Sequence, residues 1–221
     1  MILSMIVCAL LSFFGTYPDE AGQTVEHLTA GRAHIDSCLT GLDETERTMA
    51  LAVVAPEMCL YSRMLDFVEL RTLFTLYVTT GKGNFSVGPF QMKPSFIEEL
   101  HRRVDADPAL ARYSRLLRCD AEGVARRREI LRRLSSMDWQ LKYLAAFMAV
   151  ARPLARESAD ESPETKLRRI ATLYNGGLHL TPADVRRLQG RRQFPHFGRT
   201  HNYSAAALEF YRALTPPRSQ P

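Results

Sequence analysis

Two short stretches of the sequence carry residues that can do chemistry together. The first, Val54-Ala55-Pro56-Glu57, ends in a carboxylate that lies between two apolar runs. Because apolar surroundings disfavour the charged form of a carboxyl group, we expect the pKa of Glu57 to be raised. A raised pKa keeps the proton available near neutral pH, as a general acid requires. Glu57 is therefore the predicted catalytic residue; the alternative is a glutamate that points into water.

The second stretch is a glycine-rich turn, residues 83–92, some thirty residues after Glu57. Closely spaced glycines followed by Pro89 are typical of a loop with exposed backbone. Phe85, Phe90 and Met92 also lie in the turn, and a solvated loop does not need them. They suit the wall of a groove in which sugar rings stack and backbone groups bind hydroxyls. The alternative is a tight turn packed on the core.

The remaining elements are predicted to be helices that position these two stretches. One helix is expected over residues 45–54, and Pro56 predicts an end or kink there, which leaves Glu57 at a helix end. Ser95 and Glu98 have the spacing of a capping box at the start of another. Polar loops are expected at 16–40, leading into a short helix, and at 178–199. Further helices are expected at 61–78, 109–134 with a break near Gly123, 138–152, 165–174 and 203–214.

Composition predicts one folded domain with a substantial core. The chain has 221 residues, of which 46% are hydrophobic. Its net charge of +5 equals that of residues 102–133 alone, which hold ten arginines and five acids. This stretch can be a basic face for an anionic wall polymer or membrane, or a solvated helical face. Nucleic-acid binding is not expected, because Tyr113 is its only aromatic residue.

The N-terminus predicts export. Residues 1–15 are apolar apart from Ser4 and Ser12, too short for the roughly 20 residues of a membrane span. They fit the core of a secretory signal peptide, although no Lys or Arg precedes Arg32. A weak signal, a late start and a buried helix are the alternatives. We expect residues 1–21 to be a signal peptide or N-terminal apolar segment, residues 22–221 to be one domain, and the location to be the periplasm or cell envelope.

The cysteines leave the disulfide state open. The sequence contains Cys8, Cys38, Cys59 and Cys119. In an oxidising compartment Cys38 can pair with Cys59 or with Cys119, but three free thiols fit the sequence equally well.

No cofactor or metal site is expected. The cysteine spacing matches no zinc motif. His27, His34 and Asp36 lie within ten residues, and we do not expect them to bind a metal.

Several segments, in order, resemble those of one enzyme family. Glu57, followed by the turn Gly88-Pro89-Phe90-Gln91-Met92, resembles the catalytic Glu and the "GLMQ" turn of soluble lytic transglycosylases and goose-type lysozymes. Tyr174-Asn175-Gly176-Gly177 is similar to the family's "YNAG", and residues 140–145 to the helix before it. His201-Asn202-Tyr203 looks like the start of its C-terminal helix. The family usually has Ser after the Glu, where this chain has Met58.

The resemblance implies a mainly α, lysozyme-like fold with little or no β-sheet. The Arg-rich helical stretch around 102–134 is the part that the family pattern explains least, and it is interpreted as an insertion. It implies cleavage of the β-1,4 bond between N-acetylmuramic acid and N-acetylglucosamine in peptidoglycan, with 1,6-anhydro ends. Glu57 alone would serve as acid and then base, whereas ordinary glycosidases use two carboxylates. One alternative is a hydrolytic lysozyme, for which Asp66 or Glu69 would position a water. The other is a non-catalytic peptidoglycan-binding protein.

The resemblance also implies the residues that contact substrate. The amides of Gln91 and Asn175 would hold acetamido groups or hydroxyls, Tyr174 would reach the same pocket, and Tyr203 would hold the C-terminal helix against the cleft. The implied partner is the peptidoglycan glycan strand, bound by a monomer that associates with the envelope or with secretion or cell-wall machinery. The full set of expected substrate-binding residues is Ser86, Gly88, Phe90, Gln91, Met92, Tyr174, Asn175 and Tyr203.

Overall fold

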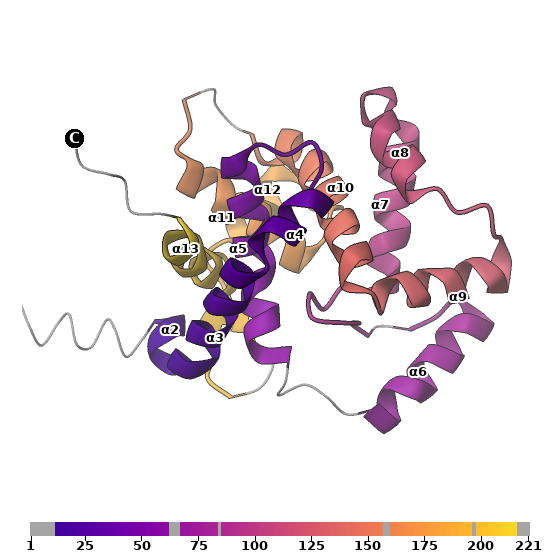
Figure 1. The fold of residues 1–221 in the computed structure, drawn as a ribbon, viewed down its shortest axis with the longest axis horizontal. Coiled ribbons are helices and arrows are strands. Elements are labelled where there is room, and N and C mark those ends of the chain that lie inside the picture. The colour runs from indigo at the N-terminus through magenta and orange to yellow at the C-terminus, as the bar shows by residue number, and fades with distance from the viewer. Residues whose placement is uncertain (1–11, 62–66, 84, 157–159, 196–197, 216–221) are drawn as a thin grey trace, which may run out of the picture.

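A computed structural model of the chain describes residues 12–61, 67–83, 85–156, 160–195 and 198–215. The fold is mainly α, as predicted, with one two-stranded sheet (Figure 1). In chain order the elements are α2 (Phe13–Thr16), α3 (Pro18–Ala30), α4 (Arg32–Cys38), α5 (Glu44–Tyr61), α6 (Phe67–Thr80), α7 (Pro94–Ala106), the 3-10 helix η1 (Pro108–Leu110), α8 (Ala111–Leu117), α9 (Gly123–Leu134), α10 (Met137–Ala155), α11 (Pro163–Gly176), α12 (Pro182–Leu188), β1 (Arg192–Phe194), β2 (His201–Asn202) and α13 (Tyr203–Leu214).

Helix α5 is the central element of the fold. Residues 48–56 are all buried, because this helix is apolar on every side and other helices surround it. It packs against α13, α3 and α11. Its first turn is capped reciprocally: the Glu46 N–H donates to Asp43 Oδ1 at 2.8 Å, and the Asp43 N–H donates to Glu46 Oε2 at 3.2 Å. The buried part of α5 leads directly to Glu57.

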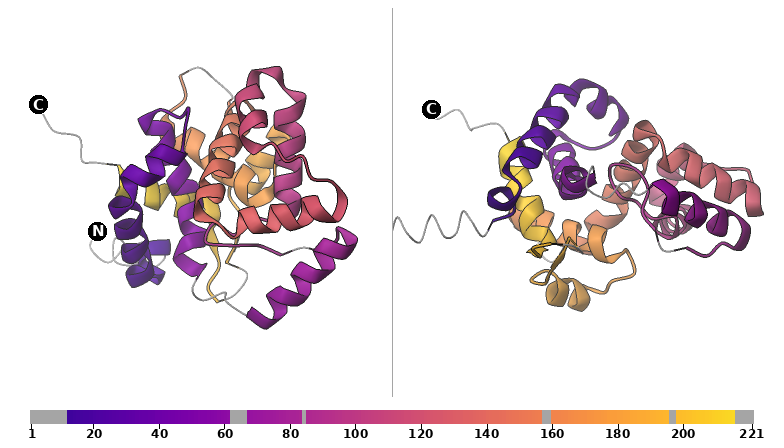
Figure 2. Two further views of the ribbon diagram at one scale, coloured as in Figure 1. Left: turned by 45° about the vertical axis from the view of Figure 1, so that its right-hand side comes forward. Right: turned by 90° about the horizontal axis from the view of Figure 1, so that it is seen from below.

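Helix α10 forms the second buried axis. Almost all of its residues from Gln140 to Ala151 are buried, and it contacts α11, α7 and α4. Helices α6 to α9 lie together on one side of the molecule, to the right in Figure 1, and α2 to α5 lie with α11 to α13 on the other (Figures 1 and 2). Helix α10 therefore connects the two groups.

The arginine-rich stretch is part of the folded domain rather than a separate basic arm. The guanidinium of Arg133 is buried, donates to the carbonyls of Leu117 and Arg118 at 2.7 and 2.8 Å, and pairs with Glu129. It lies 3.9 Å from the centre of the Trp139 ring. Arg133 thus fixes the end of α8 against α9 and α10, so this charge has a structural role.

Residues 12–21 belong to the folded body. Phe13 is 1% exposed, and Tyr17 and Ala21 are also buried. The backbone N–H groups of Phe13 and Phe14 donate to the two carboxylate oxygens of Glu209 on α13, at 3.0 and 2.9 Å. The domain therefore begins at or before residue 12, not at residue 22 as predicted; residues 1–11 lie outside the described chain.

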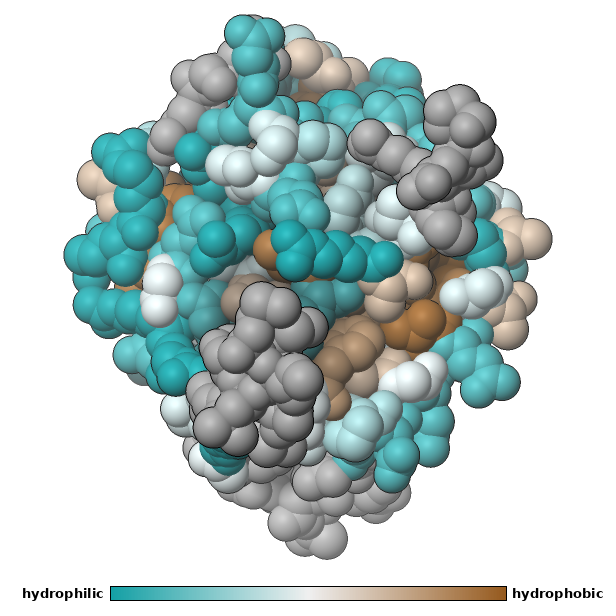
Figure 3. Space-filling model, turned by 90° about the vertical axis from the view of Figure 1, so that its left-hand side faces the viewer, coloured by the Kyte–Doolittle hydropathy of each residue, from teal (hydrophilic) through white to brown (hydrophobic). Residues whose placement is uncertain are grey.

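Figure 3 shows the face that lies on the left in Figure 1. This face is mostly hydrophilic, with apolar residues confined to small patches. None of the helices in the described ranges combines the length and the apolar character needed to cross a bilayer.

Some element boundaries differ from the sequence-based predictions. Pro56 lies inside α5, so Glu57 is within the helix, one turn before its end, rather than after a break. Residues 16–40 form α3 and α4 instead of a loop leading into one short helix. Helix α7 begins with Pro94 after an Lys93 N-cap, so the predicted Ser95 capping box is wrong.

The predicted loop 178–199 is also more ordered than expected. It contains α12, which a Thr181–Asp184 capping box starts, and β1, which pairs antiparallel with β2. The break predicted near Gly123 is confirmed, because α8 ends at Leu117 and α9 begins at Gly123. The helices predicted at 138–152, 165–174 and 203–214 correspond to α10, α11 and α13. None of the cysteines in the described ranges, Cys38, Cys59 and Cys119, forms a disulfide.

Candidate active site

Glu57 sits at the point where the buried part of α5 reaches the surface. The residues before it are buried, Glu57 itself is partly exposed, and Cys59 and Leu60 are buried again. Within the described chain its carboxyl group forms no hydrogen bond or ion pair. A glutamate that is embedded in apolar structure and still reachable from outside has the placement that a general acid needs.

The protonation of Glu57 follows from this placement. Burial raises the pKa of Glu57 from its ordinary value near 4.5 to about 8, and the positive charge of Lys93 opposes the rise. Desolvation outweighs the lysine because Lys93 is exposed, whereas the carboxyl group has little water around it. Glu57 is therefore protonated at neutral pH. No carboxyl group among the described residues contributes to this shift of its pKa.

The glycine-rich turn closes as a small hairpin. Val87 and Met92 exchange two backbone hydrogen bonds, with N···O distances of 2.9 and 3.2 Å. Gly88 has φ +71° and Gln91 has φ +51°, so both adopt the left-handed conformation that a tight turn requires. The Gln91 side chain donates from Nε2 to the Gly88 carbonyl at 2.8 Å. Lys93 follows this turn directly, and its charge is close enough to lower the pKa of Glu57.

The buried side chain of Gln140, on α10, holds the turn in place. Its Oε1 accepts from the Phe90 N–H at 2.9 Å, and its Nε2 donates to the carbonyls of Val87 and Leu134 at 3.2 and 2.5 Å. A Cβ atom at Gly88 would lie 1.7 Å from Gln140 Nε2. Only glycine therefore fits there while the amide keeps its bonds.

Two tyrosines join the turn, α11, α13 and α5 around Glu57. The Tyr174 hydroxyl donates to the Phe90 carbonyl at 2.6 Å, and the Tyr203 hydroxyl donates to the Val53 carbonyl, one turn before Glu57, at 2.8 Å. The two rings stack, with centroids 6.4 Å apart and planes at 23°. Burial, and then the nearby Glu57 carboxyl, hold the pKa of both hydroxyls well above the ordinary value.

The structure brings together most of the residues that the sequence singled out, but not in the predicted roles. Phe90 and Met92 are 0% and 2% exposed, so the prediction that their side chains form a groove wall is wrong. Apolar side chains in a turn pack inward when a core lies beneath them. Phe85 is buried for the same reason. The turn offers its backbone and polar atoms instead.

The polar residues of the predicted set remain available for binding. Ser86 and Gln91 are partly exposed, and Asn175 is exposed at the end of α11. Within the described chain, the side chains of Ser86 and Asn175 form no hydrogen bond. Tyr203 holds α13 against α5, and Tyr174 is tied to the turn rather than free in a pocket.

Sequence reasoning missed the roles of Lys93 and Gln140. A signal for Gln140 was present, because it is a polar residue on the apolar face of a predicted helix. Its partners lie about fifty residues away, so the residue could be flagged but not assigned. Nothing in the sequence separated Lys93 from other surface lysines.

The two carboxylates that the hydrolytic alternative requires cannot be placed at the site. Asp66 lies outside the described residues, and the side chain of Glu69 is likewise not described. Two surface cavities of about 370 and 350 Å³ are elsewhere: one includes Arg32 and Arg47, and the other includes His101 and Arg126. Neither is lined by Glu57. Comparison of the chain with protein-family models, with curated proteins and with solved structures gives no match.

Proposed function

We propose that the chain is a lysozyme-like peptidoglycan lytic transglycosylase with Glu57 as its acid and base. The observation that carries the proposal is the partly exposed Glu57, which is protonated at neutral pH and has no internal partner in the described chain. The convergence of Tyr174, Tyr203 and the turn on that carboxyl gives independent support. These are the segments whose sequence resembles the family.

The first step is proton transfer. Protonated Glu57 gives its proton to the oxygen of the β-1,4 bond between N-acetylmuramic acid and N-acetylglucosamine, and that bond breaks. The substrate's own N-acetyl group stabilises the positive anomeric carbon that results. A carboxyl group with a pKa of about 8 holds this proton ready across the neutral range.

The second step regenerates the acid. Glu57, now a carboxylate in apolar surroundings, is a stronger base than an exposed glutamate and takes the proton of the sugar's 6-hydroxyl. That oxygen attacks the anomeric carbon and closes the 1,6-anhydro ring. The cycle needs one carboxyl group, which agrees with a Glu57 pKa that no other described carboxyl group perturbs. Two amides are available for the acetamido groups: that of Gln91 in the turn and that of Asn175 at the end of α11.

The proposed substrate implies a location in the cell envelope. Peptidoglycan lies outside the cytoplasmic membrane, so the proposal requires export. The apolar N-terminal residues 1–11 are consistent with export, and the described residues from Ser12 onward belong to the folded enzyme. The polymeric substrate also fits an exposed site on a monomer.

The test is mass spectrometry of purified sacculi digested with the full chain. Glu57→Gln keeps the shape of the side chain and removes the proton; Glu26→Gln changes an exposed glutamate on α3 as a matched control. We expect 1,6-anhydro-ended fragments from the parent and Glu26→Gln, and none from Glu57→Gln. Fragments with ordinary reducing ends would replace the lyase by a hydrolytic lysozyme. Intact sacculi with all three proteins would reject an enzyme on peptidoglycan.

A further inference from the structure

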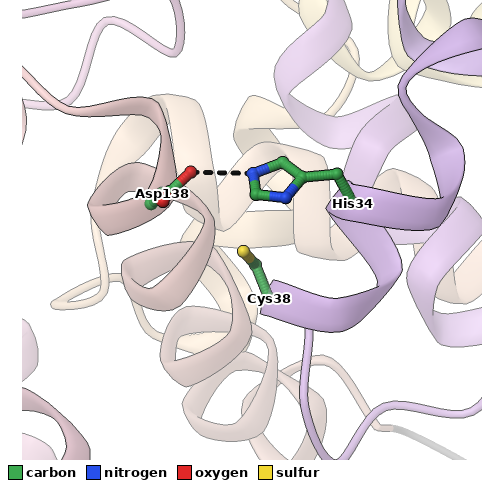
Figure 4. Close-up of side chains that lie close together, drawn as sticks. All are labelled: His34, Cys38 and Asp138. Atoms are coloured by element: carbon green, nitrogen blue, oxygen red, sulfur yellow. Dashed lines mark hydrogen bonds and ion pairs between the residues drawn. The ribbon is translucent and has the colours of Figure 1, made fainter.

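Three side chains of types that can ligate a metal, from two helices, meet at the surface. His34 and Cys38 lie on α4, and Asp138 lies in the first turn of α10 (Figure 4). Nδ1 or Nε2 of His34, Sγ of Cys38 and a carboxylate oxygen of Asp138 all lie within 4.8 Å of one another. Figure 4 shows the imidazole and the thiol pointing from α4 toward Asp138.

Local structure explains this convergence. His34 and Cys38 are four residues apart on a helix, which places both on one face. Helix α4 packs that face against α10, and His34 Nε2 lies 2.8 Å from Asp138 Oδ1. Asp36, which the sequence grouped with His34, instead pairs with Arg32 and Arg47 at 2.8 and 3.9 Å. The cluster therefore shares only His34 with the group His27, His34 and Asp36, which was not expected to bind a metal.

We propose that His34, Cys38 and Asp138 form a Zn²⁺ site that joins α4 to α10. Imidazole nitrogen, thiolate sulfur and carboxylate oxygen are the three ligand types that zinc takes in proteins. The thiolate argues against Mg²⁺ and Ca²⁺, which prefer oxygen ligands. Three protein ligands leave one tetrahedral position for water.

The geometry needs only small side-chain movements. Ligand atoms on a tetrahedral zinc ion are about 3.3–3.7 Å apart, given metal–ligand bonds of about 2.0–2.3 Å. The cluster already has one separation of 2.8 Å and none above 4.8 Å. Zinc would open the His34–Asp138 contact by less than about 1 Å and draw in the Cys38 thiol. Rotation of exposed side chains supplies such movements without a change in the backbone.

Exposure gives the ion a path to the site. The side chains of His34 and Asp138 are 63% and 55% exposed, and Cys38 is partly exposed. This proposal does not depend on the proposed function, because none of its residues contacts Glu57 or the turn in the interactions described above.

The test is titration of the reduced full chain with Zn²⁺ by calorimetry, and with Co²⁺ by absorbance. We expect one ion per chain, a near-ultraviolet charge-transfer band from a Co²⁺–thiolate bond, and a higher midpoint of thermal unfolding. Cys38→Ser should remove the charge-transfer band. His34→Ala and Asp138→Asn should each weaken binding at least tenfold.

Matched controls are available on the same chain. Cys119→Ser changes another partly exposed thiol, and His27→Ala changes an exposed histidine on α3; both should bind as the parent does. The proposal is overturned if the parent shows no saturable binding. It is equally overturned if Cys38→Ser, His34→Ala and Asp138→Asn all bind like the parent, with circular dichroism showing that each is folded.

Discussion

At the scale of single residues, Glu57 combines a high pKa with the absence of an internal partner in the described chain, and this has a consequence for stability. Its pKa is about 8 when folded and near 4.5 when exposed. Between pH 4.5 and pH 8, Glu57 is protonated in the folded chain and ionised in the unfolded chain. The contribution of Glu57 protonation to stability is therefore complete below about pH 4.5 and is lost as pH rises to about 8. Over this range the free energy of unfolding falls with a limiting slope of about 1.4 kcal/mol per pH unit.

Glu57→Gln should remove this pH dependence, because an amide does not titrate. We expect the variant to become progressively more stable than the parent as pH rises from 5 to 8. The measurement is urea unfolding of both proteins at pH 5, 6.5 and 8, in which other titrating groups cancel in the difference. A difference that stays constant with pH would mean that the carboxyl is solvated.

Lys93 should set the alkaline limit of activity. Since a general acid must hold its proton, turnover of sacculi should fall above about pH 8. The Lys93 charge lowers the pKa of Glu57, so Lys93→Met should move this fall to higher pH. The displacement should shrink in high salt, because Lys93 is exposed. Lys82→Met, at another exposed lysine, serves as the control. Identical pH–rate profiles for the two variants would exclude this role for Lys93.

At the scale of elements, the site depends on the contact between α10 and the turn. Gln140→Met keeps the length of the side chain but leaves the buried Phe90 N–H without its acceptor. It also removes the amide donor from the Leu134 carbonyl and from the Val87 carbonyl, which keeps its bond from the Met92 N–H. We expect the free energy of unfolding to fall by about 2–4 kcal/mol. Urea unfolding measures this, with Gln23→Met on the exposed face of α3 as the control. Equal stability of the two variants would show that the turn does not need the amide.

The same scale shows what the sequence can and cannot predict. Helices α10, α11 and α13 were predicted because each carries an apolar stripe at helical spacing. Helix α3 was missed because it buries few residues, although Pro18 followed by two acids is a common helix start. Of the end or kink predicted at Pro56, the end is wrong, because tertiary packing around α5 outweighs the lost backbone hydrogen bond and the helix continues to Tyr61.

The candidate site was predictable to a similar extent. Glu57, Tyr174 and Tyr203 could be selected by residue type and order, and the structure brings them together. The sequence did not predict which way each side chain points. Whether Phe90 faces a groove or the core depends on Gln140 and Tyr174, which bind its backbone from fifty and eighty-four residues away. Local patterns do not contain that information.

At the scale of the whole molecule, the N-terminal residues complete the core that supports α13. Phe13 packs between Phe194, His201 and Phe210, and the Glu209 carboxylate accepts hydrogen bonds from the backbone beside it. Helix α13 in turn carries Tyr203 to the carbonyl before Glu57. The residues from Phe13 onward and the Glu57 carboxyl are therefore connected through one helix.

This connection predicts the effect of shortening the chain. A chain of residues 22–221 loses Phe13 and Tyr17 and leaves the Glu209 carboxylate without two of its donors. Compared with residues 12–221, it should lose at least about 3 kcal/mol of unfolding free energy, the usual cost of removing one buried aromatic side chain. It should also lose activity, because α13 positions Tyr203. Urea unfolding and sacculus digestion measure the two effects. Equal stability and activity would mean that the N-terminal helices only cover a domain that is already complete, and cleavage after residue 21 would then be compatible with function.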